Sequence, residues 1–163
     1  MCANSIYLYG LLSWDIMILD LKKLKRSGKD SSDFFFSYSP ETELIDLPNA
    51  EIVLPIEING RVTLTGDHSA YIDGEVVFTV KGECTRCLKD ASHTYAVDFQ
   101  EEVEQNNPDG YPVVNDTVDL RKIVDDIIAI NSPLTFLCKE DCLGLCSGCG
   151  VNLNDGECKC KNK

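Results

Sequence analysis

Apolar and polar residues alternate with a period of two through the middle of the chain, which is the pattern of β-strands with one buried face. From Ile52 to Ile58 every second residue is apolar, and the alternation resumes with Val62 and Leu64. The dipeptide between these runs is Asn59-Gly60, and Asn-Gly favours a type I′ turn. The pattern therefore predicts a tight hairpin centred on Asn59-Gly60.

The same signal recurs further along the chain. Asp73-Gly74 separates Tyr71-Ile72 from a second alternating run over residues 76–80, and alternation returns over residues 95–99. Asp-Gly is also a turn dipeptide. Together the runs predict a meander of four or five antiparallel strands, followed by a loop over residues 105–115.

Residues 116–131, DTVDLRKIVDDIIAIN, change to a helical period. Apolar residues fall at i, i+3, i+4, i+7 and i+8, namely Leu120, Ile123, Val124, Ile127 and Ile128. Asp116 or Thr117 is the expected N-cap, and Pro133 stands just past the end. The expected fold class is α+β: a curved antiparallel β-sheet, a meander and partly barrel-like, with one main packing helix and a Cys-rich zinc-binding C-terminal tail.

The chain divides into four expected segments. Residues 1–16 are expected to be an upstream extension with no part in the fold, because Met17 opens a more natural start. Residues 17–40 form a basic N-terminal arm and a first strand, with Phe34, Phe35 and Phe36 as its inward residues. Residues 41–136 form the α+β core. Residues 137–163 form the Cys-rich tail, which packs on the core.

The N-terminal arm is basic, whereas the core is acidic. The 163-residue chain carries a formal charge of −12, and residues 41–111 hold fifteen Asp and Glu against four Lys and Arg. Such a body repels a phosphate backbone. Any RNA contact is therefore expected on the basic arm, at Lys22, Lys23, Lys25, Arg26 and Lys29.

The chain has no apolar run long enough for a bilayer and no signal-peptide pattern, so no membrane contact and a cytoplasmic location are expected. It also has no phosphate loop, nucleophile elbow or dinucleotide fingerprint. These absences favour a protein that is not an enzyme and has no small-molecule substrate.

Eight cysteines stand in four close pairs: Cys84 and Cys87, Cys138 and Cys142, Cys146 and Cys149, and Cys158 and Cys160. Four thiolates complete a tetrahedral zinc site, so eight predict two structural Zn²⁺ ions. The favoured division joins the first two pairs, tying tail to sheet, and the last two pairs in a local site. The other division joins the middle two pairs and leaves the first pair with the last.

Other uses of these thiols fit less well. A disulfide framework suits small secreted chains rather than a cytoplasmic one of this length. Iron–sulfur clusters usually show a tighter cysteine spacing. A thioredoxin-like pair would open a helix, whereas strand patterns flank Cys84 and Cys87. Other soft ions also accept four cysteines, so the spacing by itself leaves the metal open.

Four stretches, MILDLKKLKRSGKDSS, GECTRCLKDASHTYAVDFQEEV, VDLRKIVDDIIAINSPLTFLC and CLGLCSGCGVNLNDGECKC, together resemble the YceD family of bacteria and plastids. The resemblance covers residues 17–160 and implies a role in accumulation of 23S, large-subunit rRNA, through contact with the rRNA or its precursor. The alternative is a zinc-stabilised acidic module that holds a basic ribosomal protein during large-subunit assembly.

Overall fold

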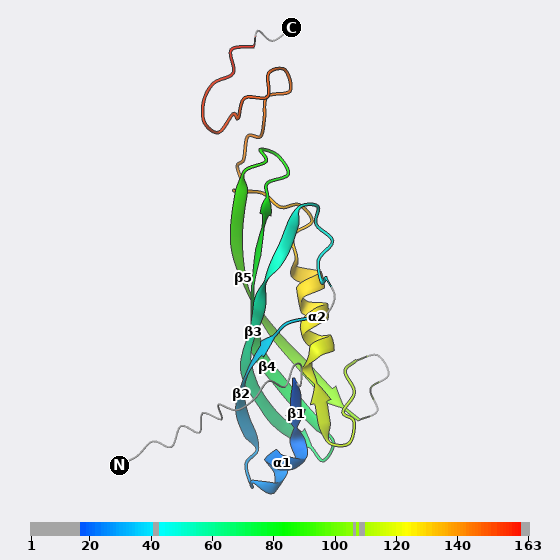
Figure 1. Ribbon diagram of the computed structural model, residues 1–163. Helices are drawn as coiled ribbons and strands as arrows, with labels where there is room; N and C mark the ends of the chain where they lie inside the picture. The colour runs from blue at the N-terminus through cyan, green and yellow to red at the C-terminus, as the bar shows by residue number, and fades with distance from the viewer. Residues whose placement is uncertain (1–16, 41–42, 106, 108–109, 161–163) are drawn as a thin grey trace, which may run out of the picture.

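The computed structural model describes residues 17–40, 43–105, 107 and 110–160. The expected upstream extension, residues 1–16, lies outside the described residues. The helices and strands follow one another in the order β1, α1, β2, β3, β4, β5, β6 and α2 (Figure 1). Neither described helix is long and apolar enough to cross a membrane.

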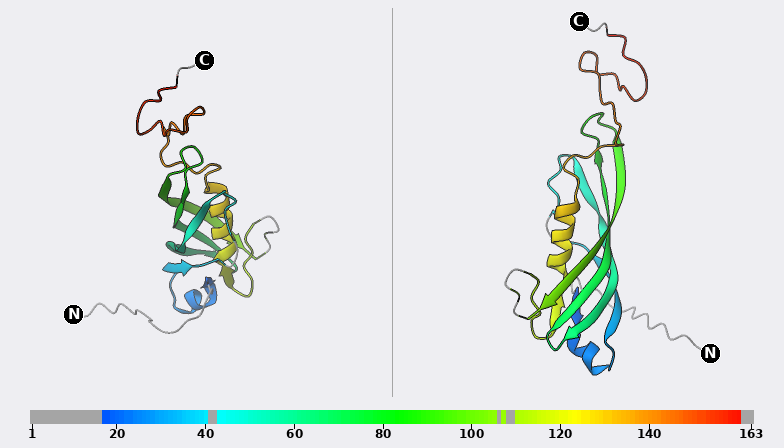
Figure 2. Two further views of the ribbon diagram at one scale, coloured as in Figure 1. Left: turned by 45° about the horizontal axis from the view of Figure 1, so that its top comes forward. Right: turned by 180° about the vertical axis from the view of Figure 1, so that it is seen from behind.

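The main sheet contains four antiparallel strands in the order β2-β3-β4-β5. Their bounds are Ser31–Tyr38, Ala50–Gly66, Ser69–Glu83 and Asp90–Glu104. The long strands give the molecule an elongated shape, and α2, Leu120–Asn131, lies along one face of the sheet (Figures 1 and 2). The expected α+β class and antiparallel sheet are confirmed. The sheet is curved but open, because β2 and β5 are its edges, so the expected barrel-like character is not confirmed.

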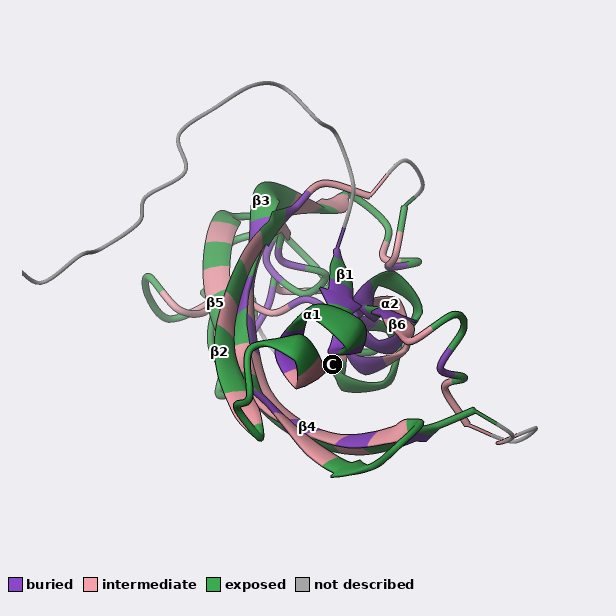
Figure 3. Ribbon diagram, turned by 90° about the horizontal axis from the view of Figure 1, so that it is seen from below, coloured by how far each residue is buried: buried purple, intermediate pink, exposed green. Residues whose placement is uncertain are grey.

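The core lies on the concave side of this sheet. Seen from below, the buried parts of the strands face inward, toward α1 and α2 (Figure 3). Helix α2 buries the five apolar residues of its predicted stripe against that face. On the sheet, residues such as Ile58, Ile72 and Phe78 are almost fully buried, while their immediate neighbours are more exposed. The predicted strand alternation therefore identifies the core face, except at Leu54, which is 48% exposed where the register shifts between Val53 and Glu57.

A small second sheet joins the two ends of the core. Strand β1, Ile18–Asp20, pairs antiparallel with β6, Thr117–Asp119. Asp20 then caps α1, Leu21–Arg26, by accepting a hydrogen bond from the Lys23 amide. The first part of the predicted arm is thus a short strand and a helical turn whose Leu21 and Leu24 are buried.

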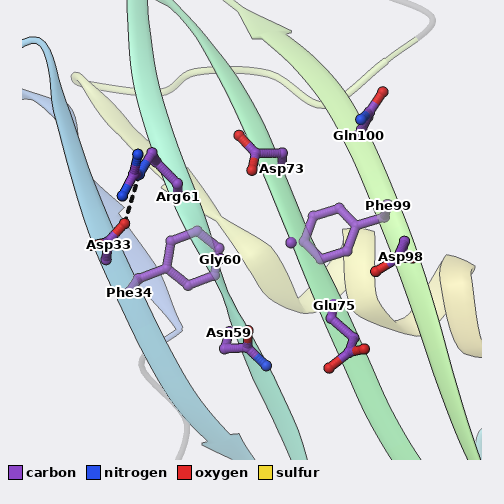
Figure 4. Close-up of a pocket in the computed structure, with 11 residues that line it drawn as sticks. Asp33, Phe34, Asn59, Gly60, Arg61, Asp73, Glu75, Asp98, Phe99 and Gln100 are labelled. Carbon is purple, nitrogen blue, oxygen red and sulfur yellow. Dashed lines mark hydrogen bonds and ion pairs between the residues drawn. The ribbon is translucent and has the colours of Figure 1, made fainter.

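The two predicted hairpin turns are wrong. Gly60 lies in the interior of β3 and Gly74 in the interior of β4, where they are paired with each other. Phe34 pairs with Gly60 on one side and Phe99 with Gly74 on the other, forming a row across all four strands (Figure 4). A Cβ on Gly60 would lie 2.8 Å from the Phe34 ring and 2.8 Å from the Gly74 Cα. The glycines therefore permit close packing under two aromatic rings rather than a turn.

The structure also corrects the predicted helix start and the inward phenylalanines. The N-cap of α2 is Asp119, whose carboxylate accepts from the Arg121 amide at 3.0 Å, and not Asp116 or Thr117. Asn115 and Asp116 instead form a turn with positive φ values of 53° and 60°. On β2, Phe34 and Phe36 pack against the core, whereas Phe35 is 64% exposed because strand neighbours face opposite ways.

Replacing Gly60 with alanine tests the role of the glycine row. Because the added Cβ would overlap the backbone of β4, we expect Gly60→Ala to lower the free energy of unfolding by about 1–3 kcal/mol. Urea denaturation followed by circular dichroism measures the change. The control is Gly156→Ala, where a Cβ meets no heavy atom within 4 Å. Equal stability of the two variants would show that the row is not tightly packed.

Candidate metal centres

The first cluster, Cys84, Cys87, Cys138 and Cys142, lies where the β4–β5 connection meets the chain that leaves α2. Its four Sγ atoms lie within 4.8 Å of one another. The Cys84 and Cys142 sulfurs are 3.7 Å apart, and those of Cys87 and Cys138 are 3.5 Å apart. Cys84, Cys87 and Cys142 are buried. The cluster therefore joins two segments separated by about fifty residues of sequence.

The second cluster, Cys146, Cys149, Cys158 and Cys160, is local to the tail and more exposed. Its sulfurs also lie within 4.8 Å of one another, with 3.1 Å between Cys146 and Cys158. Backbone amides turn toward them: Gly148 N is 3.4 Å from the Cys146 sulfur and Cys160 N is 3.2 Å from that of Cys158. This grouping is the favoured one of the two divisions considered from the sequence.

Both clusters begin with the same backbone turn. The Cys84 amide donates to the Lys89 carbonyl, and the Leu88 amide donates back to Cys84. In the second cluster Cys146 N donates to Val151 O, and Gly150 N donates to Cys146 O. The fifth residue of each turn has positive φ, 58° at Leu88 and 73° at Gly150. Each Cys-x2-Cys pair is thus held in a knuckle that turns its two sulfurs toward one point.

Hydrogen bonds fasten the chain after α2 to the knuckle of the first cluster. Both the amide and the hydroxyl of Thr85 donate to the Phe136 carbonyl, at 2.8 and 3.2 Å. His93 donates from Nε2 to the Leu137 carbonyl at 2.7 Å. Phe136 itself is buried against the core. The backbone is therefore fixed immediately before Cys138, which positions that cysteine over the knuckle.

The thiols of each cluster have opposed tendencies to ionise. Burial opposes ionisation of Cys84, but backbone amides of Cys138, Cys87 and Arg86 outweigh it and lower its pKa to about 6. Burial and the neighbouring thiols raise the pKa of Cys138 to about 12. In the second cluster, backbone amides and neighbouring thiols lower the pKa of Cys146 to about 6. The pKa of Cys160 is raised to about 12, mainly by its hydrogen bond with Cys158. All four thiols of a cluster would therefore ionise together only with a cation between them.

The donor set fits a four-coordinate soft metal. A tetrahedral site with metal–sulfur bonds of about 2.3 Å has sulfurs about 3.8 Å apart, close to the spacing in the first cluster. A disulfide would need about 2.05 Å, and the eight cysteines are free. Both clusters could therefore hold a metal ion, with Cys84, Cys87, Cys138 and Cys142 around one and Cys146, Cys149, Cys158 and Cys160 around the other.

The cationic residues predicted from the sequence lie at the other end of the molecule, on α1 and the turn after it (Figure 1). Lys25 is held there: its ammonium lies 2.9 Å from the Asp116 carboxylate and also bonds the Asp67 carbonyl. Lys22, Lys23, Arg26 and Lys29 are exposed. The sequence did not indicate Thr85 or His93 as supports of the first cluster, because their hydrogen bonds to the chain after α2 form only in the folded protein.

Comparison with known proteins assigns the chain to a family. Residues 72–163 match the family described as Large ribosomal RNA subunit accumulation protein YceD, and this region holds both clusters. The chain belongs to the YceD family. Helix α1 precedes the matched region. No solved structure matches the chain.

Several curated relatives resemble this YceD-family chain. An uncharacterized protein of Mycobacterium leprae is 30% identical over 114 residues, which are 61% of this chain and 49% of that protein. An uncharacterized protein of Mycobacterium tuberculosis is 32% identical over 92 residues, 50% of this chain and 44% of that protein. The Large ribosomal RNA subunit accumulation protein YCED homolog 1, chloroplastic, of Zea mays is 32% identical over 72 residues, 44% of this chain and 25% of that protein. The matched stretches thus span half or less of each relative.

Serine substitutions separate the two clusters of this YceD-family chain. We expect Cys149→Ser to lower the metal content from two ions to one and to free residues 146–160 while the sheet persists, because structural zinc contributes roughly 10 kcal/mol or more to its local fold. Cys84→Ser should instead detach the whole tail from the sheet. Native mass spectrometry counts the ions, and hydrogen exchange locates the loosened segment. Global unfolding of Cys149→Ser would contradict the local role of the second cluster.

Proposed function

We propose that this chain is a non-enzymatic ribosome-biogenesis factor that supports accumulation and processing of 23S rRNA by binding that RNA or its precursor. The family description and the name of the maize homologue support a role connected with large-subunit rRNA. The observation that carries the RNA contact is the cationic end, defined as Lys22, Lys23, Arg26 and Lys29. These four side chains are exposed together on α1 and the turn after it.

Electrostatics restrict where RNA binds. Eight thiolates add eight negative charges to the formal −12 and two Zn²⁺ ions return four, so the loaded chain carries −16. RNA therefore approaches favourably only at a local positive surface. The cationic end provides one, and it lies away from the cysteine tail, at the opposite end of the sheet (Figure 1). Lys25 belongs to the five cationic residues predicted to contact RNA, but its ammonium is ion-paired with Asp116, so it is left out of the cationic end.

The zinc ions have an architectural role in this proposal. When bound, Zn²⁺ would neutralise the clustered thiolates and cross-link the segments that carry them. The chain's own residues position the ligands. The knuckles orient the sulfurs, and Thr85 and His93 hydrogen-bond the backbone of Phe136 and Leu137, just before Cys138. A reducing cytoplasm suits this use, because it keeps the thiols free for metal.

A second candidate function follows from the outer face of the sheet. The side chains that flank the glycine row there include Asp73, Glu75 and Asp98, together with Asp33, which is ion-paired to Arg61 (Figure 4). A face of this charge attracts a basic chain and repels RNA. It supports the alternative in which the protein holds a basic ribosomal protein before that protein meets rRNA.

Neutralising the cationic end tests the RNA proposal. We expect the quadruple Gln variant of Lys22, Lys23, Arg26 and Lys29 to lose a discrete large-subunit rRNA segment in ultraviolet crosslinking in cells, because four phosphate contacts are removed. In vitro, the slope of log K against log salt for single-stranded RNA should fall in magnitude by about 3. Lys25 is kept so that its ion pair with Asp116 survives.

The matched control changes Lys81, Lys159, Lys161 and Lys163 to glutamine, which alters the net charge equally and keeps the ion pair between Lys122 and Asp126. Retention of the rRNA segment by the control and its loss from the first variant would support contact through α1. Equal background RNA from all three proteins would contradict direct binding. If Asp73→Asn, Glu75→Gln and Asp98→Asn together then released a co-purifying ribosomal protein, the second candidate would be supported.

A further inference from the structure

One side chain of the second cluster's loop contacts the first cluster. Asn154 lies between Cys149 and Cys158, yet its Nδ2 is 3.4 Å from the Cys142 sulfur. Its Oδ1 accepts a hydrogen bond from the amide of Leu143 at 2.9 Å. Asn154 therefore bonds both the thiol of Cys142 and the backbone that immediately follows it.

The orientation of this amide is fixed by its neighbours. The Leu143 amide is only a donor, so the oxygen of Asn154 must face it and the NH₂ group must face sulfur. The side-chain oxygen of Asn152 accepts from the backbone amide of Asn154 at 2.9 Å and from its Nδ2 at 2.8 Å. The Leu153 amide donates to the Gly144 carbonyl at 2.9 Å. The loop thus presents one donor to one thiolate.

A donor in this position stabilises the ligand form of cysteine. Hydrogen bonds to charged acceptors are roughly twice as strong as neutral ones, and a metal ligand must be deprotonated. Cys142 is buried, so solvent does not replace a lost donor. The loop that carries Asn154 is itself closed by the second cluster, because Cys149 and Cys158 stand on either side of it. Filling the second cluster therefore favours the arrangement that supports the first.

We propose that Asn154 is a positioning residue that couples the two metal centres, so that metal in the second cluster strengthens metal binding in the first. The proposal rests on the proposed function, since it needs both clusters to bind zinc. With this coupling, the first and second clusters bind metal cooperatively rather than as two independent sites.

The test is zinc affinity of the first cluster, measured by competition with chelators and counted by native mass spectrometry. Alkylation of freed cysteines and peptide mapping show which cluster lost its ion. We expect Asn154→Ala to weaken the first cluster about 10-fold or more, the usual cost of losing such a hydrogen bond to a metal ligand. Cys149→Ser should weaken it at least as much. Adding Asn154→Ala to Cys149→Ser should then have little further effect.

Two further variants separate thiolate support from loop structure. Asn154→Asp keeps an oxygen for the Leu143 amide but places a carboxylate beside sulfur, so we expect it to weaken the first cluster as much as Asn154→Ala. Asp155→Ala removes only the exposed ion pair with Lys89 and should match the wild type.

The outcomes distinguish metal binding by the clusters from coupling between them. A wild-type protein that binds no zinc would overturn the proposed metal centres themselves. Two bound ions with unchanged first-cluster affinity in Asn154→Ala or Asn154→Asp would overturn the coupling alone. Fully additive losses from Asn154→Ala and Cys149→Ser would also overturn it, because Asn154 would then act without the second cluster.

Discussion

The cluster of Cys84, Cys87, Cys138 and Cys142 is the constraint on which the C-terminal part of the molecule depends. Beyond Phe136, only Cys142 and Gly144 are fully buried among the described residues, so the tail has no apolar core of its own. Its attachment consists of clustered thiols and the hydrogen bonds around them. Four thiolates in a buried space would repel one another, and a divalent cation bound between them would turn that repulsion into a cross-link.

One long sheet holds helix α1 and the cysteine clusters apart, at its two ends (Figure 1). Lys22, Lys23, Arg26 and Lys29 are exposed on α1 and the turn after it. Asp73, Glu75 and Asp98 line the outer face between the two ends. Short ties such as the Lys25–Asp116 pair hold α1 to the β6 turn. Such a shape lets one end meet a polyanion while the acidic face meets a basic chain. The two candidate functions therefore use different charged residues, and the two surfaces meet at Asp33, which lines one pocket with Lys23 and Lys29.

The sequence predicted the elements whose signals are local. The stripe of α2 and the strand alternation required only neighbours in the chain, and both identify the core face. The predicted turns are wrong because Gly60 and Gly74 are paired with each other inside β3 and β4, between Phe34 and Phe99. Ile58 and Val62, two residues before and after Gly60, are both buried on the core face, as in one continuous strand. A two-residue turn at Asn59-Gly60 would instead place Val62 on the opposite face from Ile58. The role of Asn154 was not predictable, because it depends on how one knuckle docks on another.

Zinc K-edge X-ray absorption on the protein purified under reducing conditions tests whether the eight thiols form two four-sulfur metal centres. We expect two zinc ions per chain, each surrounded by four sulfurs at about 2.3 Å with no nitrogen or oxygen ligand. Zinc bound by mixed sulfur and oxygen ligands, or a zinc-free protein whose cysteines are paired as disulfides, would contradict this expectation.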